Sequence, residues 1–249
     1  MVTVSGTLRL LFTGSWTASM CASLLGVHAL TQDGRKFRRL ERTWADVLAR
    51  AWSMRIETHG AENVDPDGTY IFMANHQSHV DIVALMVALP IVPGFLAKKE
   101  LSRIPILGAA MQAGGHVFVD RGHRTHAIEA IDEAARIVSA GASILVFPEG
   151  TRHETEAVAL FKKGGFHLAL RAGVPVVPIG VRGTRALLPR RSRMIRAGNA
   201  SVHIGAPILP AELQQLGLEA AMSRVRREIA ALAAMPMDDT PRKRRGPRD

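Results

Sequence analysis

Short apolar runs alternate with longer helical stretches from Glu57 onward, and this alternation restricts the chain to few folds. Short strands separated by amphipathic helices are typical of α/β domains with a mainly parallel sheet. The expected strands are 69–74, 94–97, 116–119, 143–147, 174–181 and 201–204, and the expected helices are 81–89, 104–113, 125–140, 160–172 and 211–234. We therefore predict an α/β fold, a mostly parallel mixed sheet flanked by helices.

Composition divides the chain into three parts. Residues 1–56 are expected to form an N-terminal helical membrane module, residues 57–235 one α/β domain, and residues 236–249 a basic disordered tail. A domain of this size can bury one large core. The sequence contains no internal repeat and no second apolar segment large enough for another core.

The formal net charge of +10 favours an acidic partner, which could be nucleic acid, anionic lipid or a phosphorylated substrate. Aromatic residues make up only 5% of the chain, so single-stranded bases would find no stacking surface. We expect a membrane with anionic lipids or a phosphate-bearing substrate, and no nucleic acid. The only cysteine, Cys21, excludes a disulfide within the chain and fits a reducing, cytosol-facing location.

Residues 10–30 carry no formal charge and have about the ~20-residue length that crosses a bilayer. Their serine, threonine and glycine content makes them only modestly apolar, so the segment either spans the membrane or dips into it. The basic residues that follow are Arg35, Lys36, Arg38, Arg39 and Arg42. Such a cluster stays on the cytoplasmic side, whereas a secretory signal carries its basic residues ahead of the apolar core. We expect association with the cytoplasmic face of the inner membrane.

A second apolar stripe follows at helical spacing, formed by Leu40, Trp44, Val47, Leu48 and Ala51. Two interpretations of this stripe are open. It forms either the membrane-facing side of an interfacial helix or a face that packs on the α/β domain.

His76 and Asp81 are the residues best placed to do chemistry. The strand expected over 69–74 ends just before His76, and the helix expected next begins at Asp81. Open α/β sheets bind ligands at this carboxyl edge. An imidazole titrates near neutral pH, and a neighbouring carboxylate can fix its tautomer and raise its basicity. This pair predicts a general base, although Asp81 could instead cap its helix.

Two further strands end in residues suited to phosphate. Arg121 follows the strand over 116–119, and Glu149, Gly150 and Arg152 follow the strand over 143–147. The carboxyl ends of parallel strands share one edge of a sheet, so these residues are expected near His76. Guanidinium groups match phosphate oxygens, and glycine lets a ligand approach the backbone.

Four segments occur in the order and spacing of the signature blocks of the glycerolipid acyltransferase family, which this chain resembles over roughly residues 56–207. They are Asn75-His76 with Asp81, Gly115 through Phe118 to Arg121, Phe147-Pro148-Glu149-Gly150-Thr151-Arg152, and Val174-Pro175-Val176-Val177-Pro178. The resemblance implies transfer of a fatty acyl group from acyl-CoA or acyl-carrier protein to the free hydroxyl of lysophosphatidic acid, giving phosphatidic acid. No metal and no cofactor beyond this co-substrate are implied.

The resemblance also implies a role for each site residue. His76 would take the hydroxyl proton while Asp81 orients its ring. Arg121 and Arg152 would bind the acceptor phosphate, Glu149 its glycerol part, and Gly150 and Thr151 belong to the same block. Either Lys98 or Lys99 would add a phosphate contact, and the sequence does not choose between them.

The acceptor is the least specified part of this prediction, because residues 153–156 depart from the turn that many family members have after the arginine. Lyso-ornithine lipid, glycerol 3-phosphate or another lysophospholipid would suit the same catalytic pair. A different class is a metallohydrolase that uses His76, His79 and Asp81 as ligands. A third is a non-enzymatic membrane-binding protein.

Overall fold

The computed structural model describes residues 2–120, 122, 124–152, 155–192 and 194–240. Among these residues, seven strands form one sheet in the order β1-β8-β7-β2-β5-β3-β4. The strands are β1 (Met54–His59), β2 (Ile71–Ala74), β3 (Gly94–Lys98), β4 (Val117–Val119), β5 (Ile144–Val146), β7 (Val176–Arg182) and β8 (Gly198–Ile204). Neighbouring strands are parallel except β7 and β8, which are antiparallel. The predicted mostly parallel mixed sheet is confirmed.

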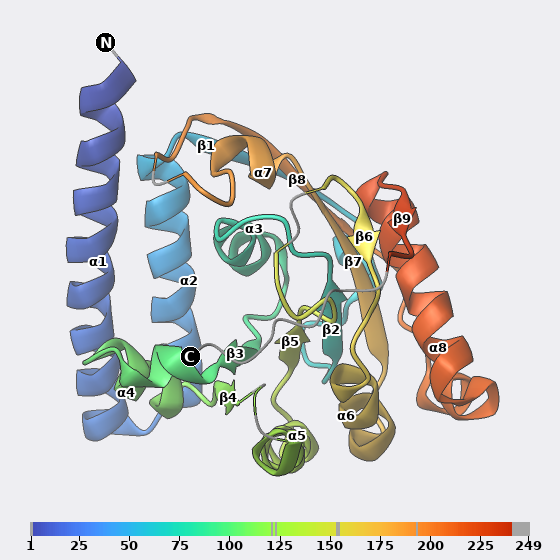
Figure 1. The fold of residues 1–249 in the computed structure, drawn as a ribbon. Coiled ribbons are helices and arrows are strands. Elements are labelled where there is room, and N and C mark those ends of the chain that lie inside the picture. The colour runs from blue at the N-terminus through green and yellow to red at the C-terminus, as the bar shows by residue number, and fades with distance from the viewer. Residues whose placement is uncertain (1, 121, 123, 153–154, 193, 241–249) are drawn as a thin grey trace.

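Helices cover both faces of this sheet (Figure 1). One face packs against α2 (Gly34–Ala51) and α3 (Asp81–Ala88), and the other against α5 (Arg124–Ser139), α6 (Gly164–Ala172) and α8 (Pro210–Ala233). The shorter elements are η1 (Ala61–Asn63), η2 (Lys99–Arg103), α4 (Leu107–Ala113), α7 (Thr184–Leu187), β6 (Val158–Ala159) and β9 (Met237–Asp238).

The central strand β2 shows why the sequence favours two covered faces. Phe72 and Ala74 point into the core beneath α2 and α3, whereas Ile71 and Met73 point into the core beneath α5, α6 and α8. All four residues are fully buried. A continuous apolar run of this kind is typical of a parallel strand with helices on both sides.

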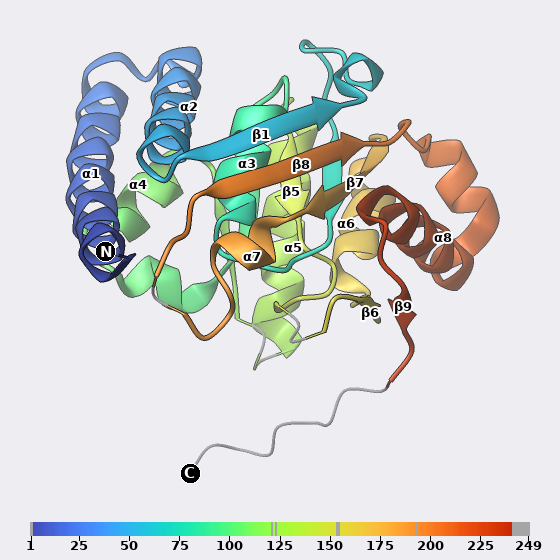
Figure 2. The same cartoon turned by 90° about the horizontal axis from the view of Figure 1, so that it is seen from above.

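The N-terminal segment forms a helical pair, α1 (Val2–Thr31) and α2, at one end of the sheet, while α8 lies at the other (Figure 2). The Trp44 indole donates to Thr17 Oγ1 at 3.0 Å, and the Trp52 indole donates to Thr13 Oγ1 at 2.9 Å. Leu48 of α2 is fully buried in the core of the α/β domain. Leu48, Trp44 and Ala51 of the stripe thus pack on the core of the α/β domain, as the second interpretation expects, while Leu40 packs against the buried cluster shared with α1.

Two cations of the basic cluster that follows residues 10–30 form hydrogen bonds within the protein. The Arg42 guanidinium donates to the carbonyl oxygens of Val87, Leu89 and Pro90 at 3.1, 2.5 and 3.3 Å. These carbonyls lie at or just beyond the C-terminal end of α3, where backbone acceptors lack helical partners. Arg38 donates to Glu41 at 2.6 Å and to the carbonyl of Gly114 at 2.7 Å.

A buried polar cluster around Glu41 joins α2 to the sheet. The Glu41 carboxylate lies 2.8 Å from His116 Nε2, and His116 Nδ1 accepts the backbone N–H of Phe95 at 3.0 Å. Because Nδ1 is an acceptor, the ring donates its proton from Nε2 to Glu41. Burial alone would raise the pKa of Glu41, but the hydrogen bond from His116 and the charge of Arg38 hold that pKa below its usual value.

The expected segment boundaries differ from the structure at both ends of the α/β domain. Strand β1 begins at Met54, inside the range 1–56 that was expected to be helical. Strand β9 lies inside the expected disordered tail and pairs in parallel with β6. Residues 241–249, which make up most of that tail, lie outside the described residues.

Candidate active site

His76 and Asp81 lie together at the carboxyl end of β2. The Asp81 Oδ2 atom is 2.8 Å from His76 Nδ1 and accepts the backbone N–H groups of Gln77 and Ser78, also at 2.8 Å. Asp81 is fully buried, whereas the His76 side chain is 15% exposed. The carboxylate thus faces back toward the histidine, and α3 has no side-chain cap at its N-terminus. This arrangement orients the ring and leaves His76 Nε2 to meet a substrate.

The loop between β2 and α3 is held to strand β7 and to the segment that follows α7. The Asn75 side chain exchanges two hydrogen bonds with the backbone of Val181, at 2.9 and 2.7 Å, and so extends the pairing of β2 with β7. The Ser78 hydroxyl donates to the carbonyl of Leu188 at 2.7 Å. The position of His76 is therefore set by the sheet itself, and Ser78 is committed to a structural bond.

Glu149 lies directly behind the histidine. One carboxylate oxygen accepts the backbone N–H of His76 at 2.7 Å, and the other accepts the N–H of Ala159 at 3.1 Å. The residue is fully buried. Both oxygens thus bind backbone groups, a use of Glu149 that the sequence did not predict.

A turn after β5 brings Phe147 and Gly150 to the site. The Gly150 N–H donates to the Phe147 carbonyl at 2.9 Å, and the Phe147 ring stacks on His76 with a centroid separation of 3.9 Å. Gly150 has φ +73°, and a Cβ there would lie 2.9 Å from Lys162 Cδ. Lys162 therefore covers the backbone of Gly150, a contact that the sequence did not reveal.

The charge of Arg152 interacts with that of Asp81. Partial desolvation and the charge of Arg190 lower the pKa of Arg152, while Asp81 acts in the opposite direction. Partial desolvation and the charge of Arg152 lower the pKa of His79 to about 4. His79 is therefore neutral at physiological pH beside a fixed cation. Thr151, next to Arg152 in the chain, is exposed.

The two candidate lysines differ in their surroundings. Lys99 Nζ lies 2.9 Å from Asp120 Oδ2, which joins the end of β3 to the end of β4. Lys98 is more exposed and pairs with Glu100 at 2.7 Å. Arg121, which follows Asp120, lies outside the described residues. The described neighbours of Arg121 favour Lys99 over Lys98 as a member of the site.

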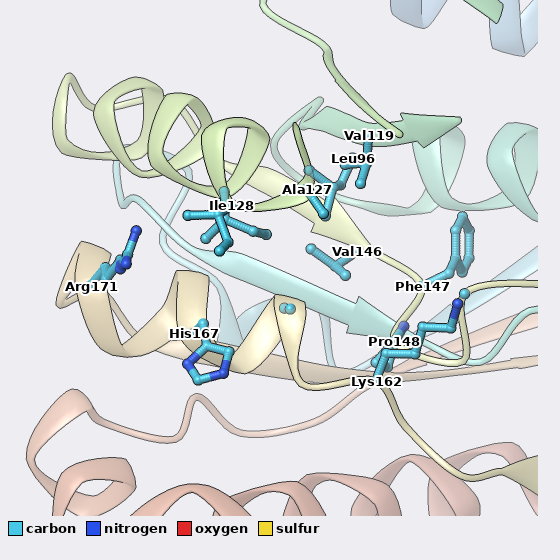
Figure 3. Close-up of a pocket in the computed structure, with 14 residues that line it drawn as sticks. Leu96, Val119, Ala127, Ile128, Val146, Phe147, Pro148, Lys162, His167 and Arg171 are labelled. Carbon is cyan, nitrogen blue, oxygen red and sulfur yellow. The ribbon is translucent and has the colours of Figure 1, made fainter. Parts of the chain in front are cut away.

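An apolar slot of about 440 Å³, lined in part by Phe147, runs between α5 and α6 (Figure 3). Val119, Val146 and Ile128 are among the side chains that line it. In Figure 3, Phe147 and Lys162 lie toward one end and Arg171 lies at the other. An apolar cavity with a few polar groups at its margins is typical of small-molecule sites.

The metal-site alternative finds limited support in the residues that the structure describes. Within them, no three histidine, cysteine, aspartate or glutamate side chains are grouped as they would be around a metal ion. His76 and Asp81 bond to each other, and His79 shares its surroundings with the cation Arg152.

Comparison with known proteins adds three findings. The model of the Acyltransferase family matches residues 55–182. The chain is 29% identical over 224 residues to human 1-acyl-sn-glycerol-3-phosphate acyltransferase alpha, covering 89% of this chain and 78% of that protein. It is 30% identical over 207 residues to the enzyme of the same name from Mus musculus, covering 80% and 71%.

A solved structure is similar over almost the whole chain. The 1-acyl-sn-glycerophosphate (LPA) acyltransferase PlsC from Thermotoga maritima aligns with a TM-score of 0.81 and 26% sequence identity. The alignment covers 94% of this chain and 97% of that protein. The similarity therefore includes the helical pair as well as the sheet.

Proposed function

Because this chain belongs to the acyltransferase family, we propose that it transfers a fatty acyl group from a thioester to the free hydroxyl of lysophosphatidic acid, giving phosphatidic acid. The names of its relatives support this acceptor. The observation that carries the proposal is the 2.8 Å contact between His76 and Asp81 at the carboxyl edge of the sheet.

The His76 ring acts as the general base. Its Nε2 atom takes the hydroxyl proton while the hydroxyl oxygen bonds to the thioester carbonyl carbon. The C–S bond then breaks, and the same proton passes from His76 to the departing thiolate. Asp81 fixes the tautomer and stabilises the imidazolium that forms between these steps. Base catalysis of this kind contributes about 10² to 10⁴ in rate.

The cations at the strand ends bind the acceptor phosphate. Arg152 lies near the catalytic pair, and Lys99 lies at the end of β3 beside Asp120. Arg121, which follows β4 in the sequence, contributes by resemblance to the family. The apolar slot beside Phe147 has the composition that a fatty acyl chain requires. The thiol carrier is coenzyme A or acyl-carrier protein.

We also propose that α1 rests on the cytoplasmic surface of the membrane that contains the acceptor. Among the described helices, α1 is the one long and apolar enough to cross a bilayer. However, Arg9 donates to the Ile195 carbonyl at 3.2 Å and Leu24 packs with Ala110, so α1 contacts the α/β domain near both ends. A spanning α1 would draw these polar partners into hydrocarbon. An orientation along the surface keeps them hydrated.

The test is an acceptor panel offered to purified protein with a labelled acyl-CoA or acyl-carrier protein. Transfer to lysophosphatidic acid is the expected result. Transfer only to lyso-ornithine lipid, glycerol 3-phosphate or another lysophospholipid would replace the acceptor and keep the reaction. His76→Ala should abolish turnover in folded protein, while His79→Ala serves as the matched control. Loss of activity with a chelator, restored by a metal ion, would favour the metallohydrolase.

A further inference from the structure

The loop between η2 and α4 exposes two isoleucines. Ile104 is 44% exposed and Ile106 is 49% exposed. The helix that follows, α4, packs against α1: Ala110 shares a buried cluster with Leu24. Figure 1 shows α4 beside α1 and α2, whereas α8 lies across the sheet. The loop is therefore close to the C-terminal half of α1, the long apolar helix.

Ile106 adopts a backbone conformation that few residues of its kind adopt. Its φ is +64° and its ψ is −51°, and the Leu107 N–H donates to the Pro105 carbonyl at 2.6 Å. These values define a γ-turn of the rare, positive-φ kind. A β-branched residue is strained in this region, whereas glycine adopts it freely. Folding stability alone would favour glycine here, so the exposed isoleucine points to a role outside the fold.

The loop is held rigidly in this shape. The Gly108 N–H donates to the Ile104 carbonyl at 2.9 Å, and the Ser102 hydroxyl donates to the Lys99 carbonyl at 2.7 Å. A Cβ at Gly108 would lie 2.3 Å from the Ser102 carbonyl oxygen. The two isoleucines are therefore presented by a closely packed turn.

Positive charge borders the loop. Arg103 is exposed beside Ile104. Exposed apolar side chains beside cations favour binding to an anionic lipid surface.

We propose that the loop over residues 102–107 is a second membrane contact, separate from the helical pair. Ile104 and Ile106 enter an anionic lipid surface beside α1, and Arg103 pairs with lipid phosphates. Because η2 joins this loop to Lys99, the contact sets the phosphate-binding edge of the site at the level of the lipid headgroups. This proposal rests on the proposed function in one respect: it takes the acyl acceptor to be a membrane lipid.

The test compares binding of the full chain to phosphatidylcholine vesicles with and without phosphatidylglycerol. Ile106→Gly removes both the apolar side chain and the backbone strain. It should lower the partition coefficient on anionic vesicles about tenfold or more, while the melting temperature stays equal or rises. Ile104→Ser should also lower the partition coefficient on anionic vesicles, but it should not raise the melting temperature. Leu209→Ser, at an exposed leucine before α8, is the matched control and should bind as wild type.

Other occupants of the loop predict different results. Equal partition of Ile106→Gly and wild type overturns the proposal. The proposal is also overturned if Ile106→Gly binds vesicles as wild type does but loses self-association, measured by sedimentation without vesicles. Loss of affinity for acyl-carrier protein with unchanged vesicle binding would overturn it as well. A water-soluble short-chain acceptor separates this question from the reaction: Ile106→Gly should acylate it at the wild-type rate. If wild-type protein acylates no acceptor, the proposed function fails. The vesicle comparison still shows whether the loop over residues 102–107 binds the membrane.

Discussion

The Glu149 carboxylate accepts the backbone N–H of His76 at 2.7 Å, and its second oxygen accepts the N–H of Ala159 at 3.1 Å. A fully buried carboxylate with both oxygens on backbone donors holds the loop that carries His76 in place. The acceptor-binding role that the family resemblance implies for Glu149 stays a prediction, and the two roles give different kinetics.

Glu149→Gln tests whether the hydrogen bonds of Glu149 hold the His76 loop in position. The amide can replace one carboxylate acceptor, but its NH₂ group would face a backbone N–H, which costs about 1–3 kcal/mol. If Glu149 positions His76, kcat falls while KM for the acceptor stays the same. A rise in KM at constant kcat would identify Glu149 as an acceptor ligand instead. Glu62→Gln, the same substitution at an exposed position in η1, is the control and should change neither parameter.

Asp81→Asn should lower kcat by about 10⁴ with little change in circular dichroism. The amide oxygen can take the place of Oδ2 and keep the contacts to His76, Gln77 and Ser78, but the negative charge that stabilises the imidazolium is lost. The measurement is single-turnover acyl transfer with saturating substrates. Asp67→Asn, in an exposed turn, is the matched control. Near-normal turnover of Asp81→Asn in folded protein would mean that His76 is not the base.

Arg152→Lys should raise KM for a phosphate-bearing acceptor about tenfold to a hundredfold, because the ammonium group lacks the planar fork of donors. The rate with a neutral acceptor such as a monoacylglycerol should change little. Titration of both acceptors under steady-state conditions gives the comparison. An equal effect on the two acceptors would show that Arg152 acts on something other than phosphate.

Glu41→Gln should destabilise the protein by about 1.5–3 kcal/mol at neutral pH, because it removes the charge that His116 and Arg38 bind. The pKa of Glu41 lies below its usual value of 4.5 in the folded protein. The extra unfolding free energy of wild type over Glu41→Gln is therefore fully present above pH 4.5, the usual pKa of the group. It disappears as the pH falls through the lower pKa of the folded protein. Urea unfolding at several pH values measures it. A difference that persists at low pH would assign the effect to packing.

Much of the sheet could be predicted because its central strands are continuous apolar runs. Strand β1 was missed because Arg55, Glu57 and His59 interrupt its pattern, as an edge strand allows. Its only sheet partner is β8, which lies about 140 residues away in sequence and supplies the pairing from Gly198 onward. No local pattern carries that information.

The contact between His76 and Asp81 could be predicted because only four residues lie between them, across a strand end and a helix start. The hydrogen bonds of Glu149 could not be predicted, since its partners are backbone groups that any residue at those positions would offer. The contact of Lys162 with Gly150 also depends on the turn over 147–150 rather than on residue type. These features required coordinates.

The Arg42 guanidinium binds carbonyls at the C-terminal end of α3, whose first residue is Asp81. Eight helical residues make a rigid strut of about 12 Å. Helix α3 is thus held at its first residue, Asp81, by the loop of His76 and at its other end by a side chain of α2. A displacement of the helical pair against the sheet would reach the proton-transfer geometry through this strut.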